Sequence, residues 1–345
     1  MAEYGLGRRE ALLALAAGVA GLPAGARAEA GRVVIGTWGG DYAALLDKNI
    51  EAPILKPLGF EVVQDQASDS PRRAKMTAEK RLPRGTTDVQ ALSAAGMFEM
   101  QEAGVLLTLD YSQIPNAKNL LPTMKYPYGV GHIYSGNTVV YNPKMVSPAP
   151  VGFKDMFDPK HGSKLGLIDI QYQIVMISAA LAAGGGVTDI EKGKPLLMAV
   201  KAAGARIYPT NEAFAQGLKA EEVSVGMIWK ARVVQWQNAG IPVESVAPAE
   251  GLPMYVSGFC IPRNAPNKAG AYAYLNAMLE KSAQEAFAVD MGYNATVNNA
   301  AVAPDLLKRI GFTPDEQKRL VDMDYAYLAK NDAAMKDWWD KVFKA

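Results

Sequence analysis

Five aromatic side chains stand where they could line a site for a small molecule. The stretch RVVIGTWGGDY carries Trp38 and Tyr42 directly after a predicted strand, with two glycines between them. Trp229, Tyr255 and Tyr293 also stand at predicted strand ends or in turns. Aromatic faces at such places can stack on an organic solute or attract an ammonium group by about 0.5–2 kcal/mol for each face. The alternative for Trp38 is an ordinary turn, with its ring packed under C-terminal helices.

Charged side chains near these rings would set the chemistry of a ligand. Asp41, Glu212 and Glu250 could contact an amine, whereas Arg232 could hold a carboxylate or phosphate by two parallel hydrogen bonds. Both contacts together would suit a zwitterion. Simpler alternatives exist, because Asp41 could cap the helix that begins at Tyr42 and Arg232 could form a salt bridge. The two glutamates could be ordinary surface residues.

The sequence offers little that is typical of catalysis or of metal binding. It contains no G-x-S-x-G, P-loop or H-E-x-x-H motif. Cys260 alternates with apolar neighbours in SGFCIP, which favours a small buried side chain over a nucleophile. His132 and His161 are far apart and have no second ligand at helical spacing. The sequence therefore predicts a binding protein, not an enzyme, without a cofactor or a metal.

The N-terminus and the overall charge bear on location and partners. Residues 1–28 contain the pair Arg8 and Arg9, then an apolar run, and end on Ala26-Arg27-Ala28, which predicts a cleaved export signal. The arginine pair favours twin-arginine export over an ordinary secretory signal. The apolar run is shorter than the ~20 residues that a bilayer requires. Beyond residue 28 the chain has 33 basic and 33 acidic residues, which argues against nucleic acid or a membrane surface as partner.

Strands and helices must alternate to position the candidate residues. The predicted strands are 33–37, 60–64 and 88–92, and the predicted helices are 42–50, 72–81 and 97–103. This order is typical of a parallel sheet flanked by helices. Ligands of such sheets lie beyond the carboxyl ends of the strands. Trp38 and Ser93 each follow a predicted strand, which is the place for a binding site.

Chain length predicts two domains of ~150 residues each. Strands at 138–141 and 255–261 each separate one αβ stretch from the next, and we expect both to cross between the domains. The first domain is then discontinuous and comprises 29–139 together with 256–345. The second domain comprises 140–255.

Four longer motifs resemble a known family: TWGGDY, NTVVYNPKMV…FKDMFDPKHGSKLGL, VGMIWKARV, and APAEG…FCIPRNAPNKAGAYAYLNAML…MGYNATVNNA. In this order they are similar to periplasmic solute-binding proteins of the spermidine/putrescine type. The resemblance implies an α/β periplasmic-binding-protein fold of type II, with two lobes joined by two crossing strands and closing on a ligand. It also implies a monomeric periplasmic protein that delivers its solute to an ABC permease and ATPase complex. A sensor that presents its ligand to a receptor is the alternative.

Some positions depart from the polyamine-binding pattern. Ser257 stands where the polyamine binders of this family carry an aspartate, and Ala95 stands where we expect an aromatic residue. The segment 168–174 supplies Gln171 and Tyr172 instead of a clear pair of acids. A desolvated ammonium group without a counter-charge costs several kcal/mol, so we expect a smaller or differently charged solute than a long polycation. The predicted ligand contacts are Trp38, Asp41, Tyr42, Ser93, Gln171, Tyr172, Trp229, Arg232, Tyr255, Ser257 and Tyr293.

Overall fold

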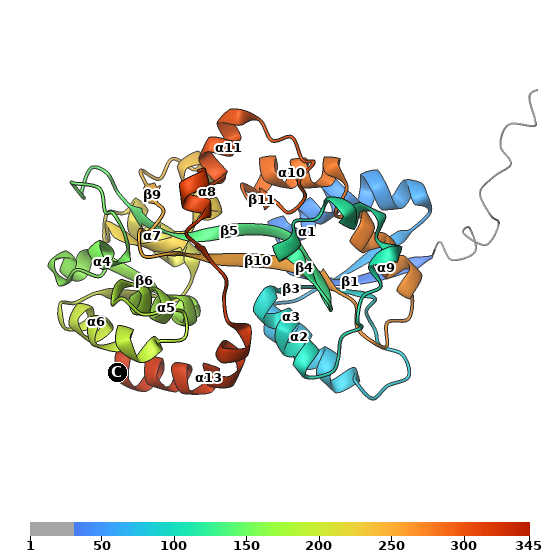
Figure 1. Ribbon diagram of the computed structural model, residues 1–345, viewed down its shortest axis with the longest axis horizontal. Coiled ribbons are helices and arrows are strands. Elements are labelled where there is room, and N and C mark those ends of the chain that lie inside the picture. Colours follow the sequence, from blue (N-terminus) through green and yellow to red (C-terminus); the bar gives the residue numbers. More distant parts are fainter. Residues whose placement is uncertain (1–30) are drawn as a thin grey trace, which may run out of the picture.

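The protein folds into two α/β units joined by two long strands. The computed structural model describes residues 31–345, so the predicted export signal lies outside the described range. β5 (Gly129–Tyr141) and β10 (Leu252–Cys260) run side by side between the units (Figure 1). The predicted strands at 138–141 and 255–261 belong to these two elements. Within the described range no helix has both the length and the apolar character needed to cross a membrane.

The first unit is built on a parallel sheet, as the sequence predicts. Its elements are β1 (Arg32–Thr37), α1 (Asp41–Leu46), the π-helical segment Asp47–Leu55, β2 (Glu61–Gln66), α2 (Asp69–Glu79), β3 (Val89–Ser93), α3 (Ala94–Glu102), β4 (Lys125–Tyr126), α9 (Lys268–Ala277), α10 (Lys281–Met291) and β11 (Asn294–Ala295). β1 pairs in parallel with β2 and β3, and β10 continues the sheet antiparallel to β3. The predicted strands and helices of this stretch are confirmed to within a few residues.

The second unit repeats this plan on a smaller scale. Its elements are α4 (Phe153–Met156), β6 (Leu165–Ile168), α5 (Tyr172–Ala182), α6 (Ile190–Ala202), β7 (Arg206–Tyr208), α7 (Asn211–Lys219), β8 (Val225–Trp229), α8 (Lys230–Asn238) and β9 (Glu244–Val246). β6 pairs in parallel with β7 and β8, while β8 and β9 both pair antiparallel with β5. The segment after β11 adds α11 (Pro304–Ile310), α12 (Pro314–Gln317), β12 (Leu320–Val321) and α13 (Tyr325–Trp338).

A single strand, β5, passes from one sheet to the other. Its first part pairs with β10, where Ser135 lies opposite Tyr255. Its second part pairs with β8, where Asn137 lies opposite Trp229. Because side chains two residues apart on a strand lie on the same face, this register brings residues of both units to one place.

The turn after β1 depends on a glycine. Gly40 has φ 67° and ψ −143°, a conformation that side-chain-bearing residues rarely adopt. α1 then begins at Asp41, and the residue in the N-cap position is Gly40. Asp41 is thus not the helix cap that the sequence offered as an alternative, and its carboxylate is exposed.

The C-terminal segment packs on the second unit. Leu328, Met335, Trp339 and Phe343 join the hydrophobic cluster that contains Leu197 of α6. The sequence placed all of 256–345 with the first unit, but this segment spans both, since α13 contacts α3 as well as α5. The physical reason is that an amphipathic helix can bury its apolar side chains against any apolar face.

Trp339 should stabilise this arrangement strongly. Its ring is fully buried, and its Nε1 donates to Asp169 Oδ1 at 2.7 Å. We expect Trp339→Ala to lower the free energy of unfolding by about 3–5 kcal/mol, as for other large-to-small core changes. The neighbouring Trp338 is only half-buried, so Trp338→Ala is a matched control with an expected loss of about 1 kcal/mol. Urea unfolding followed by circular dichroism would measure both, and equal losses would contradict this account.

Candidate ligand-binding cleft

A cleft of about 810 Å³ opens between the two units, beside the β5–β10 pair. The first unit contributes Trp38, Asp41 and Tyr42 from the end of β1 and the start of α1. The second unit contributes Trp229 and Arg232 from the junction of β8 and α8. Both units therefore supply walls to the same cavity.

The predicted ligand contacts fall into three groups. Most of them line the cleft: Trp38, Asp41, Tyr42, Trp229, Arg232, Tyr255, Ser257 and Tyr293. Ser93 and Gln171 line a smaller adjoining cavity of about 270 Å³, which shares Trp229 and Tyr255 with the cleft. Tyr172 lines neither of these two cavities, and its hydroxyl donates to Asp332 of α13.

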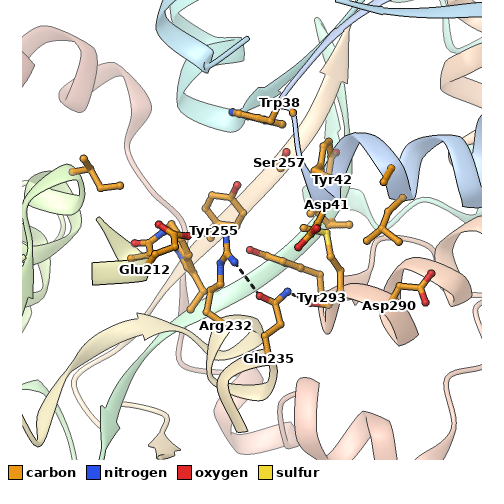
Figure 2. A pocket seen from close by; sticks show the side chains of 18 residues that line it. Trp38, Asp41, Tyr42, Glu212, Arg232, Gln235, Tyr255, Ser257, Asp290 and Tyr293 are labelled. Atoms are coloured by element: carbon orange, nitrogen blue, oxygen red, sulfur yellow. Dashed lines mark hydrogen bonds and ion pairs between the residues drawn. The ribbon is translucent and has the colours of Figure 1, made fainter. Parts of the chain in front are cut away.

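The aromatic rings form two groups in the cleft (Figure 2). The rings of Trp229 and Tyr255 are 4.6 Å apart between centroids, and Tyr293 follows at 5.9 Å from Tyr255. On the other side, Trp38 meets Tyr42 edge to face, with centroids 5.3 Å apart. Two aromatic walls of this kind can hold a small organic solute between them.

A buried histidine holds Tyr42 in place. His132, on β5, is fully buried, and its Nδ1 lies 3.0 Å from the Tyr42 hydroxyl. The rings of Phe259 and Phe287 meet it edge to face at 5.1 and 4.4 Å. Burial lowers the pKa of His132 to about 3, so the ring is neutral at physiological pH. The sequence missed this support, because the partners lie far apart along the chain.

Arg232 has capacity to bind an anion. Its Nη1 donates to Gln235 Oε1 at 3.1 Å, and its Nη2 is 4.0 Å from Glu212 Oε1. The Glu212 side chain is 71% exposed, so this ion pair is loose. The buried Nε of Arg232 has no hydrogen-bond partner among the described residues. By contrast, Lys230 points away from the cleft and donates to Gly311 O.

The acidic residues of the cleft differ in whether their carboxylates are free to contact a ligand. Asp41 and Glu212 line the cleft and are exposed. Asp290 also lines it, but Lys48 Nζ and Asn49 Nδ2 donate to its carboxylate at 2.8 and 3.0 Å. Burial acts to raise the pKa of Asp290, and the hydrogen bonds from Lys48 and Asn49 outweigh it, so the pKa falls.

Glu250 is not at the cleft. Its carboxylate accepts hydrogen bonds from the backbone N–H groups of Phe153 and Lys154, at 3.0 and 2.7 Å, at the start of α4. The suggestion that Glu250 contacts an amine is therefore wrong. Helix N-termini favour carboxylates for their unpaired N–H groups, and this local role explains the residue.

Sequence reasoning also missed several lining residues. Asn211 and Gln235 line the cleft from α7 and α8, and Ile170 lines it with 62% of its surface exposed. Asn211 follows β7 closely, so a strand-end signal could have found it. Asp290 lies within α10 and carries no local signal.

Ser257 and Ala95 stand in place of the aspartate and the aromatic residue that the family resemblance led us to look for. Ser257 is 1% exposed, and its hydroxyl donates to Leu92 O at 3.5 Å, so the floor of the cleft holds no carboxylate at this position. Ala95 lines the smaller cavity, where it leaves space for a ligand group. The Oε1 atom of Gln171 is buried there without a hydrogen-bond partner among residues 31–345.

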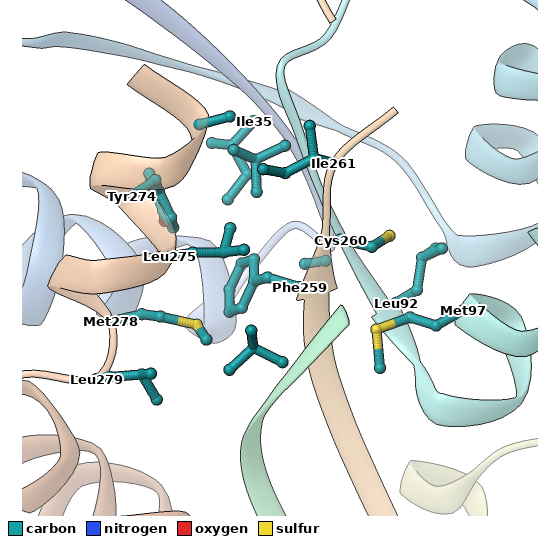
Figure 3. Close-up of a cluster of buried hydrophobic side chains, with 14 of the residues drawn as sticks. Ile35, Leu92, Met97, Phe259, Cys260, Ile261, Tyr274, Leu275, Met278 and Leu279 are labelled. Atoms are coloured by element: carbon teal, nitrogen blue, oxygen red, sulfur yellow. The ribbon is translucent and has the colours of Figure 1, made fainter. Parts of the chain in front are cut away.

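Cys260 is a buried side chain, as the sequence predicts. It is fully buried among Leu92, Phe259 and Ile261 (Figure 3). Burial raises the pKa of its thiol, which keeps the sulfur protonated and unreactive. In the part of the chain that the structure describes, no three His, Cys, Asp or Glu side chains are grouped to hold a metal ion.

Comparison with known proteins agrees with the architecture. Residues 56–311 match the model of a family described as bacterial extracellular solute-binding protein. The spermidine/putrescine-binding periplasmic protein of Salmonella typhimurium is 26% identical over 250 residues, which cover 68% of this chain and 70% of that protein.

Solved structures show the same fold. An ABC transporter substrate-binding protein from Bradyrhizobium japonicum has a TM-score of 0.79 at 21% identity, covering 91% of this chain and 100% of that chain. The solved structure described as the Atu4243–GABA receptor also has a TM-score of 0.79 at 21% identity, covering 91% of this chain and 98% of that chain. The chain thus has the two-lobed periplasmic-binding-protein fold of type II.

The buried His132 should make stability depend on pH. In the unfolded chain a histidine binds a proton near pH 6.5, whereas folded His132 does so only near pH 3. The unfolded state therefore gains protons first as the pH falls, and this contribution to stability, complete above pH 6.5, decreases below it. From pH 7.5 to pH 5 we expect a loss of about 2 kcal/mol from this group alone.

Urea unfolding at the two pH values would check this. His132→Gln keeps a group that can form a hydrogen bond with Tyr42. Between pH 7.5 and pH 5 this variant should lose about 2 kcal/mol less stability than the wild type. His161→Gln replaces the only other histidine and should behave as the wild type. Identical pH dependence in wild type and His132→Gln would refute the assignment.

Proposed function

The chain belongs to the family of bacterial extracellular solute-binding proteins, and we propose that it serves an ABC importer by capturing a small amine-containing solute. The observation that carries this proposal is the convergence of aromatic rings from both units on one cleft. Trp38 comes from the first unit and Trp229 from the second, while Tyr255 stands on a strand that joins them. Exposed Asp41 and Glu212 are the acids available to an amine.

We further propose that the two units are lobes that close on the solute. The lobes are the first unit and 140–255, with β5 and β10 as the hinge and the C-terminal helix lying across both. A solute that touches rings of both lobes would favour the closed state, since a ligand shifts a conformational equilibrium by its differential affinity. The closed protein, monomeric and periplasmic after removal of residues 1–28, would then deliver its solute to a membrane permease and its ATPase.

Arg232 favours a solute that also carries an acid group. Its Nε has no hydrogen-bond partner within 31–345, and its contact with Glu212 is loose, so its N–H groups can donate to a carboxylate, phosphonate or phosphate. A zwitterion, such as an amino acid derivative or an aminophosphonate, would use Arg232 together with Asp41. A long polyamine fits less well, because Ser257 offers no charge at the floor of the cleft.

A thermal-shift screen of the mature protein would test this proposal. The panel should contain polyamines, amino acids, aminophosphonates and organic acids. A ligand at a hundredfold excess over its dissociation constant stabilises the folded state by ~2.7 kcal/mol, so a true solute should raise the melting temperature clearly. We expect the largest shift from a compound with one amine and one acid group. A spermidine shift as large as any other would contradict our interpretation of Ser257.

Arg232→Met should weaken binding of the best acid-bearing compound. Removal of charge-assisted hydrogen bonds costs about 1.5–3 kcal/mol, or roughly 10- to 100-fold in Kd. Lys230→Met is the matched control, because Lys230 stands two residues away and points out of the cleft. Isothermal titration should show a Kd within about twofold of wild type for this control. Equal losses in both variants would show that Arg232 does not contact the solute.

A further inference from the structure

A buried arginine covers one face of Trp38. The Cζ atom of Arg72, in α2, lies 4.8 Å from the centroid of the Trp38 ring. Arg72 is 1% exposed and does not line the cleft, whereas Trp38 does. The guanidinium therefore occupies the protein side of the ring. Figure 2 shows the Trp38 ring nearly edge-on, with Ser257 and Tyr255 both on one side of it.

Hydrogen bonds fix this arginine behind the ring. Its Nε donates to Ala67 O at 2.9 Å, and its Nη1 donates to Gly36 O, Gln90 Oε1 and Ala91 O at 3.1, 3.0 and 2.5 Å. All of these acceptors are uncharged. Within residues 31–345 the Nη2 atom has no hydrogen-bond partner. The bonds orient Arg72 without neutralising it.

The positive charge of Arg72 persists behind Trp38. Burial lowers the pKa of Arg72, and attraction to Asp69 opposes this shift. Asp69 forms its own ion pair with Arg73, at 3.1 Å. An arginine stays protonated in proteins because its intrinsic pKa is so high.

This charge changes what the free face of Trp38 can bind. A cation over a tryptophan ring gains a factor of roughly 2–30 in affinity. Two unit charges on opposite faces of one ring, ~9 Å apart, repel by about a factor of 20 at an effective dielectric constant near 20. The two effects are of similar size, so an ammonium group gains almost nothing there. An anion meets the opposite balance, because Arg72 attracts it while the negative face of the ring repels it. An uncharged group keeps its stacking contact in full.

We propose that Arg72 cancels the attraction of the free face of Trp38 for an ammonium group and so reserves that face for an uncharged part of the solute. The inference rests on the proposed ligand cleft and refines it. The ammonium group is left to Asp41 and Glu212, while acid groups have Arg232.

Collisional quenching of Trp38 fluorescence tests the charge at this face without any solute. The fluorescence of Trp38 is obtained by subtracting the fluorescence of the Trp38→Phe variant from that of the same protein with Trp38 in place. Iodide and caesium quenching are each normalised to N-acetyltryptophanamide at equal ionic strength. We expect iodide to quench Trp38 about threefold better than caesium. Arg72→Met removes the charge at similar length and should bring this ratio close to one, whereas the control Arg72→Lys should keep it.

A second variant covers the case in which Arg72→Met does not fold. Asp69→Asn removes the acid that opposes the charge of Arg72, so the ratio of iodide to caesium quenching should rise. An unchanged ratio in folded Arg72→Met would overturn the inference. If Arg72→Met does not fold, an unchanged ratio in Asp69→Asn would overturn it. That result would leave the proposed function intact, because failure of the proposed function would appear separately, as no binding in the solute screen.

Discussion

The binding cleft depends on the pairing of β5 with two different partners. β5 pairs with β10 up to Gly136 and with β8 from Asn137 onward. This change of partner places Tyr255 opposite Ser135 and Trp229 opposite Asn137, two residues further along β5. The centroids of the Tyr255 and Trp229 rings are 4.6 Å apart. A strand shifted by one residue would turn these side chains to the other face. The register of β5 thus builds the wall that both units share.

Behind the other two rings of the cleft, Trp38 and Tyr42, buried polar groups hold the rings at fixed angles. Tyr42 is bonded to the neutral ring of His132, and Trp38 is backed by Arg72. Neither support touches the cleft, and each is more than nine-tenths buried. A buried polar group is costly unless its partners are in place, so these contacts disfavour other positions of the rings. Preorganised rings lose little freedom when a solute binds.

The sequence predicted the local elements and the strand-end residues well, and the contacts between distant segments poorly. The alternation around Trp38 and Ser93 sufficed to place strands, helices and the carboxyl edge of the sheet. The family resemblance added Trp229, Tyr255 and Tyr293, which local patterns alone do not separate from core residues. Sequence reasoning missed side chains whose role depends on packing. Arg72, His132 and Asp290 contact partners that are remote in the chain. The C-terminal helix, which the sequence assigned to the first unit alone, contacts both units, because the spacing of its apolar residues does not specify which surface it packs against.

The balance of charge in the cleft then follows from which groups are already paired. Asp290 is satisfied by Lys48 and Asn49, so it contributes little attraction for a second cation. Arg232 is only loosely paired, and it therefore keeps most of its attraction for an anion. With Arg72 behind Trp38, positive potential reaches the cleft from both units, whereas Asp41 and Glu212 stand at its exposed margin. A solute with charges of both signs is the one that such a cleft can hold across both lobes, because its acid end meets the loosely paired Arg232 and its amine end meets an exposed carboxylate.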